Sequence, residues 1–216
     1  MPNFIELRAA QLPGREMRFS EPPIFDWHEI VVNAADEIAA MNSKSIILFG
    51  HSLGAVLAFE VARSLRRDHG IVVGGLVVSG HCAPHLEPRS PAVRHLEGRD
   101  LLERLEELYG GIPSAVLEEP ELIQIVSRAA NADVTVAETY RHVEESPLDC
   151  PLLAFGGKSD PWVSNDELAL WDRQTLGPFK ATLLPGGHFY LQDAPIQRSL
   201  LKQIIHLCEN ARSRRL

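Results

Sequence analysis

A serine flanked by glycines is the residue of this chain best placed to do chemistry. Ser52 lies in Gly-His-Ser-Leu-Gly at 50–54, after an apolar run at 45–49 and before a helix-like run at 55–65. On such a strand-to-helix turn the serine hydroxyl stands clear of the sheet, and the two glycines are expected to avoid collisions with the neighbouring strand and helix. The backbone N–H of Leu53 would face a developing oxyanion. The pattern predicts a nucleophilic serine.

Two later segments supply the partners that a serine needs. Asp160 follows a predicted buried strand at 151–157, and His188 follows another at 181–184 on a glycine-rich loop. A serine hydroxyl becomes nucleophilic when a base removes its proton, and an acid must orient that base. We therefore predict Ser52 as nucleophile, His188 as general base and Asp160 as orienting acid. The order Ser, Asp, His is that of α/β-hydrolases.

Other assignments remain open from the sequence alone. Gly-x-Ser-x-Gly also fits an ordinary turn whose glycines only permit close packing, and Asp149 or Asp166 could be the acid. His81 follows a predicted strand and is a weaker rival for the base, whereas His51 is expected to shape the turn. The remaining histidines are expected to be solvated: His28, His69, His85, His95, His142 and His206.

The elements that must position these residues alternate between strands and helices. This alternation predicts one α/β-hydrolase domain over 1–216, a mostly parallel sheet covered by helices on both faces. A helical insertion at about 83–147 is expected to form a lid over the serine. The predicted strands are 4–8, 45–49, 75–79, 152–155 and 181–184, and the predicted helices are 26–41, 53–67, 98–109, 114–143, 166–175 and 194–212.

Eight segments of the chain match the pattern of one known family: 48–55, 59–63, 11–16, 109–113, 132–133, 156–157, 160–161 and 185–189. Through these segments the chain resembles the type II thioesterases that accompany non-ribosomal peptide and polyketide synthases. The resemblance implies hydrolysis of acyl groups from the phosphopantetheine arm of an acyl or peptidyl carrier protein through an acyl-enzyme on Ser52, without a cofactor. The triad logic alone predicts acyl transfer to water, from an ester, amide or thioester.

The chain departs from that family at its start. Members begin with a strand and a histidine- and glycine-containing loop that donates the second oxyanion N–H, whereas residues 1–8 resemble the strand that follows it. Three explanations are open: the protein begins further upstream, the strand at 4–8 pairs with 45–49, or the product is impaired. Losing one oxyanion donor costs about 100- to 1,000-fold in turnover. We expect low activity unless the chain is extended.

Composition limits the partners. The chain of 216 residues is 45% hydrophobic, contains no apolar run of about 20 residues and has no secretory leader, which predicts a cytoplasmic protein. A net charge of −8 argues against nucleic acid and anionic membranes. Arg63, Arg66 and Arg67 are either a carrier-docking patch or a solvated helix face. Three scattered cysteines predict neither a disulfide framework nor a zinc site.

The leading hypothesis is a thioesterase that removes stalled or wrongly primed acyl groups from carrier proteins, acting as a monomer. One alternative is a carboxylesterase or lipase-like hydrolase that uses the same three residues on oxygen esters. The other is a non-catalytic binding protein that keeps the fold without a complete oxyanion hole. Labelling of Ser52 by a fluorophosphonate separates the enzymes from the binding protein, because labelling requires an activated hydroxyl.

Overall fold

The computed structural model describes residues 2–41, 43 and 45–213. The chain divides into two compact units. The first contains Met1–Arg8, Val31–Pro88 and His142–Leu216, and the second contains Ala9–Ile30 and Arg89–Arg141.

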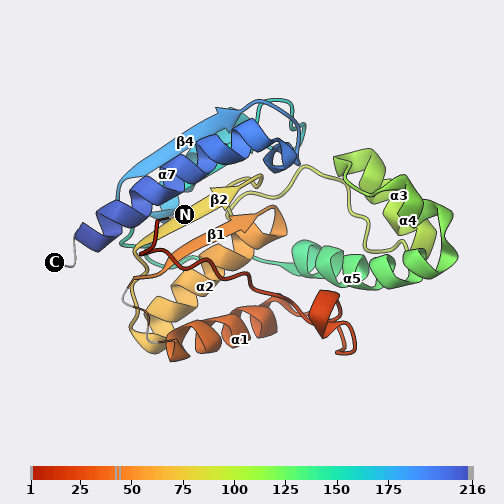
Figure 1. Ribbon diagram of the computed structural model, residues 1–216, viewed down its shortest axis with the longest axis horizontal. Helices are drawn as coiled ribbons and strands as arrows, with labels where there is room; N and C mark the ends of the chain where they lie inside the picture. The colour runs from red at the N-terminus through yellow and green to blue at the C-terminus, as the bar shows by residue number, and fades with distance from the viewer. Residues whose placement is uncertain (1, 42, 44, 214–216) are drawn as a thin grey trace. The chain divides into compact units, whose positions relative to one another are not determined.

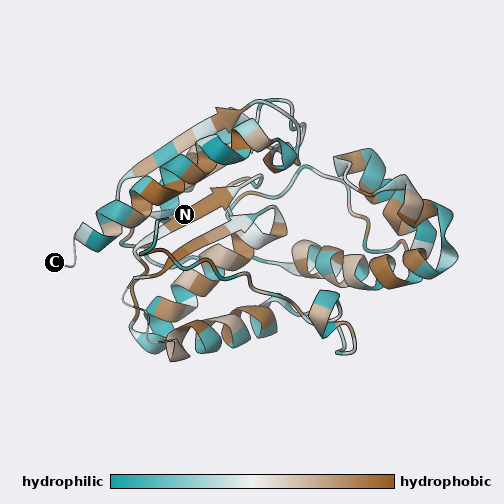
Figure 2. Ribbon diagram, in the orientation of Figure 1, coloured by the Kyte–Doolittle hydropathy of each residue, from teal (hydrophilic) through white to brown (hydrophobic). Residues whose placement is uncertain are grey.

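The first unit contains a parallel sheet of four strands in the order β1-β2-β3-β4 (Figure 1). The strands are β1 Ile47–His51, β2 Gly75–Ser79, β3 Leu152–Gly157 and β4 Phe179–Leu184. Every residue of β2 is buried, as expected for an inner strand covered on both faces. Apolar residues accordingly dominate the inner strands, whereas the helices alternate between apolar and polar faces (Figure 2).

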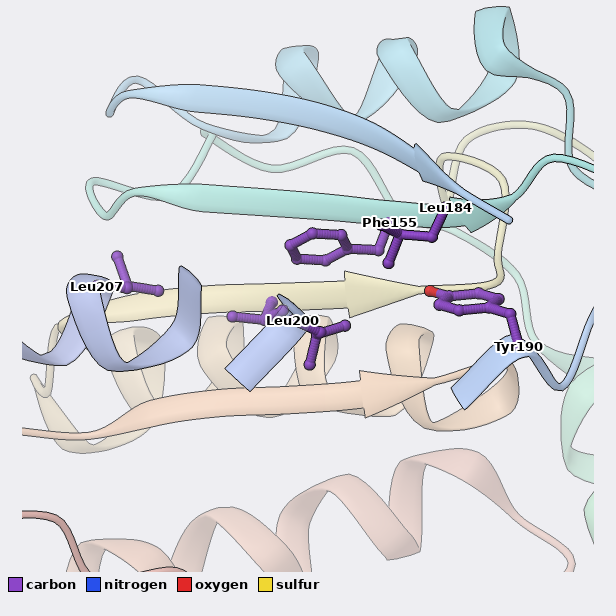
Figure 3. Packing of buried hydrophobic residues seen from close by; sticks show 6 residues of the cluster. Phe155, Leu184, Tyr190, Leu200 and Leu207 are labelled. Atoms are coloured by element: carbon purple, nitrogen blue, oxygen red, sulfur yellow. The ribbon is translucent and has the colours of Figure 1, made fainter. Parts of the chain in front are cut away.

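Helices cover both faces of this sheet. α2 Leu53–His69 packs on β1 and β2, and α7 Ala194–Ser213 packs on β2 from the other face (Figure 3). Leu200 and Leu207 of α7 join a buried cluster with Val77, Phe155, Leu184 and Tyr190. The short α6 Asn165–Ala169 contacts β3 and β4. The predicted mostly parallel α/β architecture with helices on both faces is confirmed.

Several boundaries differ from the sequence predictions. α1 is Trp27–Ala40, and the Asp26 carboxylate accepts a hydrogen bond from the His28 N–H at 2.9 Å near its start. The predicted helix at 166–175 is instead α6 followed by the 3₁₀-helix η2 Leu170–Gln174. The predicted strand at 4–8 is wrong. A strand requires a hydrogen-bonded neighbour, and none of the strands in the described residues pairs with this segment.

The second unit is mainly helical. α3 Gly98–Tyr109 and α4 Ser114–Glu118 both pack on α5 Pro120–Thr139, and a short 3₁₀-helix, η1, spans Glu16–Arg18. The single helix predicted at 114–143 is divided because Glu119 precedes a proline and adopts an extended conformation, with φ −107° and ψ 114°.

Two loops of this unit are held by charged side chains of α5. Arg15 makes two hydrogen bonds of 2.8 Å to the Asp133 carboxylate, which joins the segment at 11–16 to the helix. The Glu138 carboxylate accepts hydrogen bonds from the backbone N–H groups of Val93 and Arg94. These contacts order segments that have no regular secondary structure of their own.

Candidate active site

Ser52 lies on a sharp turn between β1 and α2. Its φ of 54° and ψ of −125° are unusual for a residue with a side chain, and Glu16 is the other non-glycine residue with positive φ among those described. Hydrogen bonds hold this conformation, with the Ser52 N–H donating to the Ser79 carbonyl at 2.8 Å and the Ala55 N–H donating to the Ser52 carbonyl at 2.9 Å. Backbone strain of this kind persists only where the surroundings enforce it.

The two glycines beside the serine have different roles. A Cβ atom at Gly50 would lie 1.8 Å from the carbonyl oxygen of Gly54, so only glycine fits there. A Cβ atom at Gly54 would meet no atom within 4 Å. The sequence prediction that both glycines avoid collisions is therefore right for Gly50 and wrong for Gly54, because the Gly54 Cβ position faces open space.

The structure brings the three predicted side chains together. His188 Nδ1 lies 2.8 Å from Asp160 Oδ2, and His188 Nε2 lies 2.9 Å from Ser52 Oγ. Only 5% of the His188 side chain and none of the Asp160 side chain is exposed. An ionised carboxylate can only accept hydrogen bonds, so the proton of a neutral His188 lies on Nδ1 and Nε2 accepts from the serine hydroxyl. Of the three candidate acids, Asp160 supplies this contact.

The loops that carry the acid and the histidine are bonded to each other through their backbones. The Lys158 N–H donates to the Leu184 carbonyl at 2.8 Å, and the Ser159 N–H donates to the Gly186 carbonyl at 2.9 Å. A Cβ atom at Gly157 would lie 2.2 Å from the Gly187 carbonyl oxygen, so glycine permits this approach. The other carboxylate oxygen, Asp160 Oδ1, accepts a hydrogen bond of 3.0 Å from the Trp162 N–H. These contacts fix the Asp160–His188 pair.

The other histidines near the site are poor bases. Burial, together with the nearby His188, lowers the pKa of His51 to about 4. Burial also lowers the pKa of His81, whose Nδ1 lies 2.8 Å from the Cys82 carbonyl. Four of the six histidines expected to be solvated are exposed, but His85 and His142 are half-buried with ring centroids 6.3 Å apart.

Two residues of the site were missed by sequence reasoning. Ser79 Oγ lies 2.8 Å from His51 Nδ1 and 2.5 Å from the Tyr190 hydroxyl. Both Ser79 and Tyr190 are buried. The available signal was their position, since Ser79 ends the strand beside the strand-to-helix turn at 50–54 (the elbow) and Tyr190 comes two residues after His188.

Leu53 begins α2, as the sequence predicted for the oxyanion donor. The first N–H groups of a helix have no acceptor within that helix, so this group is available to a ligand. Among the residues that the structure describes, no group of three or more His, Cys, Asp or Glu side chains could hold a metal ion.

The proposed arginine patch on α2 is exposed only in part, since Arg63 is buried, Arg66 is partly buried and Arg67 is exposed. Arg63 is 2% exposed, pairs with Glu60 at 2.8 Å and donates to the Val143 carbonyl. Arg66 donates to the carbonyls of Ser146 and Pro147. These side chains attach the segment at 143–147 to α2, so Arg63 fits neither a docking patch nor a solvated face.

Comparison with known proteins gives a consistent result. Residues 1–208 match the family model described as Thioesterase domain. The gramicidin S biosynthesis protein GrsT of Aneurinibacillus migulanus is 34% identical over 193 residues, which cover 89% of this chain and 75% of GrsT. Thioesterase PikA5 of Streptomyces venezuelae is 40% identical over 191 residues, which cover 88% of this chain and 67% of PikA5.

Solved structures show the same similarity. RedJ, a thioesterase from the prodiginine biosynthetic pathway in Streptomyces coelicolor, superimposes with a TM-score of 0.82 at 33% identity, covering 92% of this chain and 74% of RedJ. YbtT, a type II thioesterase from the yersiniabactin pathway, gives a TM-score of 0.79 at 28% identity, covering 93% of this chain and 80% of YbtT. Within the described residues, no helix is long and apolar enough to cross a membrane.

Proposed function

Since this chain belongs to the thioesterase domain family, we propose that it hydrolyses acyl thioesters on the phosphopantetheine arm of carrier proteins. The pathways would be those of non-ribosomal peptides, polyketides or fatty acids. The observation that carries this proposal is the continuous hydrogen-bonded chain from Asp160 through His188 to Ser52. Type II thioesterases among the similar structures support the choice of thioester over oxygen ester.

In the acylation step, Ser52 Oγ attacks the thioester carbonyl carbon while His188 Nε2 takes the hydroxyl proton. The Leu53 N–H donates to the oxyanion that forms. The carbon–sulfur bond then breaks, and His188 returns its proton to the leaving thiol. Asp160 holds the imidazole in the required tautomer and stabilises the imidazolium.

In the deacylation step, water takes the place of the departed thiol. His188 removes a proton from that water, which attacks the acyl carbonyl, and then protonates Ser52 as the acid product leaves. These steps use the protein's own side chains, a backbone N–H and water, so we expect EDTA to leave the rate unchanged.

We also propose that the insertion at 83–147 acts as a substrate-covering lid within a single domain. Leu122 and Ile125 of α5 support this role, because each has a large apolar side chain that is more than a third exposed in the structure. If they contact acyl chains, Leu122→Ser and Ile125→Ser should raise KM for long acyl groups more than for acetyl. Equal effects on all chain lengths would remove the support for this role.

The test compares hydrolysis of acyl-carrier thioesters and of p-nitrophenyl esters, each by the unaltered chain and by Ser52→Ala. We expect a preference for the carrier thioester and loss of both activities in the variant. A strong preference for the oxygen ester would favour a carboxylesterase. Absence of both turnover and fluorophosphonate labelling would favour the binding protein. The cytoplasmic location and monomeric state stay predictions from the sequence.

A further inference from the structure

A second set of hydrogen bonds connects the two loops of the active site behind the triad. It runs from Tyr190, on the histidine loop, through Ser79 at the end of β2 to His51, which precedes the nucleophile. The Ser79 carbonyl also accepts a hydrogen bond of 2.8 Å from the Ser52 N–H. One buried serine therefore contacts both the elbow and the histidine loop.

The position of Tyr190 suits this connection. It lies in the 3₁₀-helix η3 Tyr190–Gln192, directly after the loop that carries His188. In Figure 3 its ring joins the buried cluster under α7, and its hydroxyl lies at the carboxyl end of β2. The ring is thereby held by apolar packing, and the hydroxyl contacts Ser79 at the end of β2.

The His51 ring is enclosed on several sides. Its centroid lies 5.1 Å from that of His188 and 5.9 Å from that of Tyr190. A Cβ atom at Gly80 would lie 2.6 Å from His51 Cε1, so the backbone there approaches the ring as closely as glycine permits. His51 therefore forms part of the surface against which the His188 ring lies.

Both contacts can be made in either direction, because each hydroxyl can donate or accept and the imidazole has two neutral tautomers. If Tyr190 donates to Ser79 and Ser79 donates to His51 Nδ1, the His51 proton lies on Nε2. In the opposite direction His51 Nδ1 donates to Ser79, which donates to Tyr190. His51 Nε2 is itself buried without a hydrogen-bond partner in the described residues. The hydroxyl chain is thus what fixes the ring.

We propose that Tyr190, Ser79 and His51 form a positioning bridge that sets the distance between Ser52 and His188. The bridge does not touch substrate. It acts by holding the imidazole and the nucleophile at hydrogen-bonding distance while the proton moves between them. This inference rests on the proposed hydrolysis, since its effect is measured on the same reaction.

Removing one hydroxyl tests the bridge. Tyr190→Phe keeps the ring and its packing, and Ser79→Ala keeps the backbone carbonyl that accepts the Ser52 N–H. Because a misplacement of about 1 Å can cost on the order of 100-fold in rate, we expect each variant to lose roughly 10- to 100-fold in kcat with KM nearly unchanged. The double variant should be no slower than the slower single variant, since both interrupt one chain.

Rates are expressed per active site titrated with a fluorophosphonate, so partial unfolding does not enter the comparison. Ser64→Ala serves as the matched control. It removes a buried serine hydroxyl that bonds Asp68, and it should keep the unaltered kcat. A kcat of Tyr190→Phe within twofold of the unaltered chain, or losses that multiply in the double variant, would overturn the bridge. An unaltered chain that titrates but does not turn over thioesters would instead overturn the proposed function.

Discussion

Substituting alanine for each glycine beside Ser52 should produce opposite results. In Gly50→Ala the new Cβ atom would lie 1.8 Å from the Gly54 carbonyl oxygen, 2.2 Å from its carbon and 2.7 Å from the Ala55 nitrogen. All three atoms belong to the backbone of the first turn of α2, so no side-chain rotation can relieve the contact. The turn must move away from β1.

The size of that movement follows from the structure. Carbon atoms do not approach such atoms closer than 3.0 Å, so the two segments must separate by about 1.2 Å. The triad depends on contacts of 2.8 and 2.9 Å, and Ser52 lies between the segments that separate. A displacement of about 1 Å can cost on the order of 100-fold in rate. We therefore expect Gly50→Ala to lose at least about 100-fold in kcat/KM.

Gly54→Ala provides the matched control. Its Cβ atom would meet nothing within 4 Å, and the residue lies in the first turn of α2 without a positive φ. Alanine reduces the freedom of the unfolded chain, which stabilises a compatible site by about 0.4–1 kcal/mol. We expect unfolding at a slightly higher temperature and catalysis close to that of the unaltered chain.

Both variants are assayed by thioester hydrolysis, by the rate of fluorophosphonate labelling of Ser52 and by thermal unfolding. The labelling rate reports the reactivity of the Ser52 hydroxyl independently of carrier binding. The reasoning would be refuted by a Gly50→Ala protein with unaltered labelling and turnover, or by a Gly54→Ala protein as impaired as Gly50→Ala.

The remaining predictions concern the acid, a buried histidine and a buried arginine. Asp160→Asn should reduce kcat by about 10,000-fold because the amide favours the wrong imidazole tautomer, whereas Asp166→Asn, at an exposed position, should keep the full rate in the same assay. The folded pKa of His51 is about 4 against an ordinary value of 6.5, so the unfolded chain binds more protons between these values and stability falls as pH drops from 6.5 to 4. This loss amounts to roughly 3 kcal/mol and should be smaller in His51→Gln when urea unfolding is followed across that range. Arg63→Leu removes a buried cation that pairs with Glu60 and should destabilise the protein by about 3 kcal/mol in urea unfolding, whereas Arg104→Ala, at an exposed ion pair, should cost less than about 1 kcal/mol.

Local patterns were sufficient to predict that Ser52, Asp160 and His188 lie together. The turn at Ser52, the loop after β3 and the loop after β4 each carry a residue type and a glycine pattern that are rarely combined without a function. Parallel strands place their carboxyl ends at one edge, so three separate segments could be predicted to meet. The helix at 98–109 and the strand at 75–79 were also predicted with the observed bounds.

Contacts between distant segments that carry no motif could not be predicted in this way. The segment at 4–8 alternates like a strand, but whether it becomes one depends on a partner that no local pattern specifies. Arg63 has the periodicity of an exposed face, and its burial depends on a segment 80 residues later. Ser79 and Tyr190 carry no motif, and their contact joins residues 111 positions apart.

The bonds between the acid loop and the histidine loop are made by main-chain groups. A peptide N–H donates in the same way whatever side chain the residue carries, so most substitutions in these loops leave these hydrogen bonds intact. Divergence can therefore accumulate around the triad while its geometry is retained. The 28–33% identity and TM-scores near 0.8 of the similar structures are what such tolerance would produce.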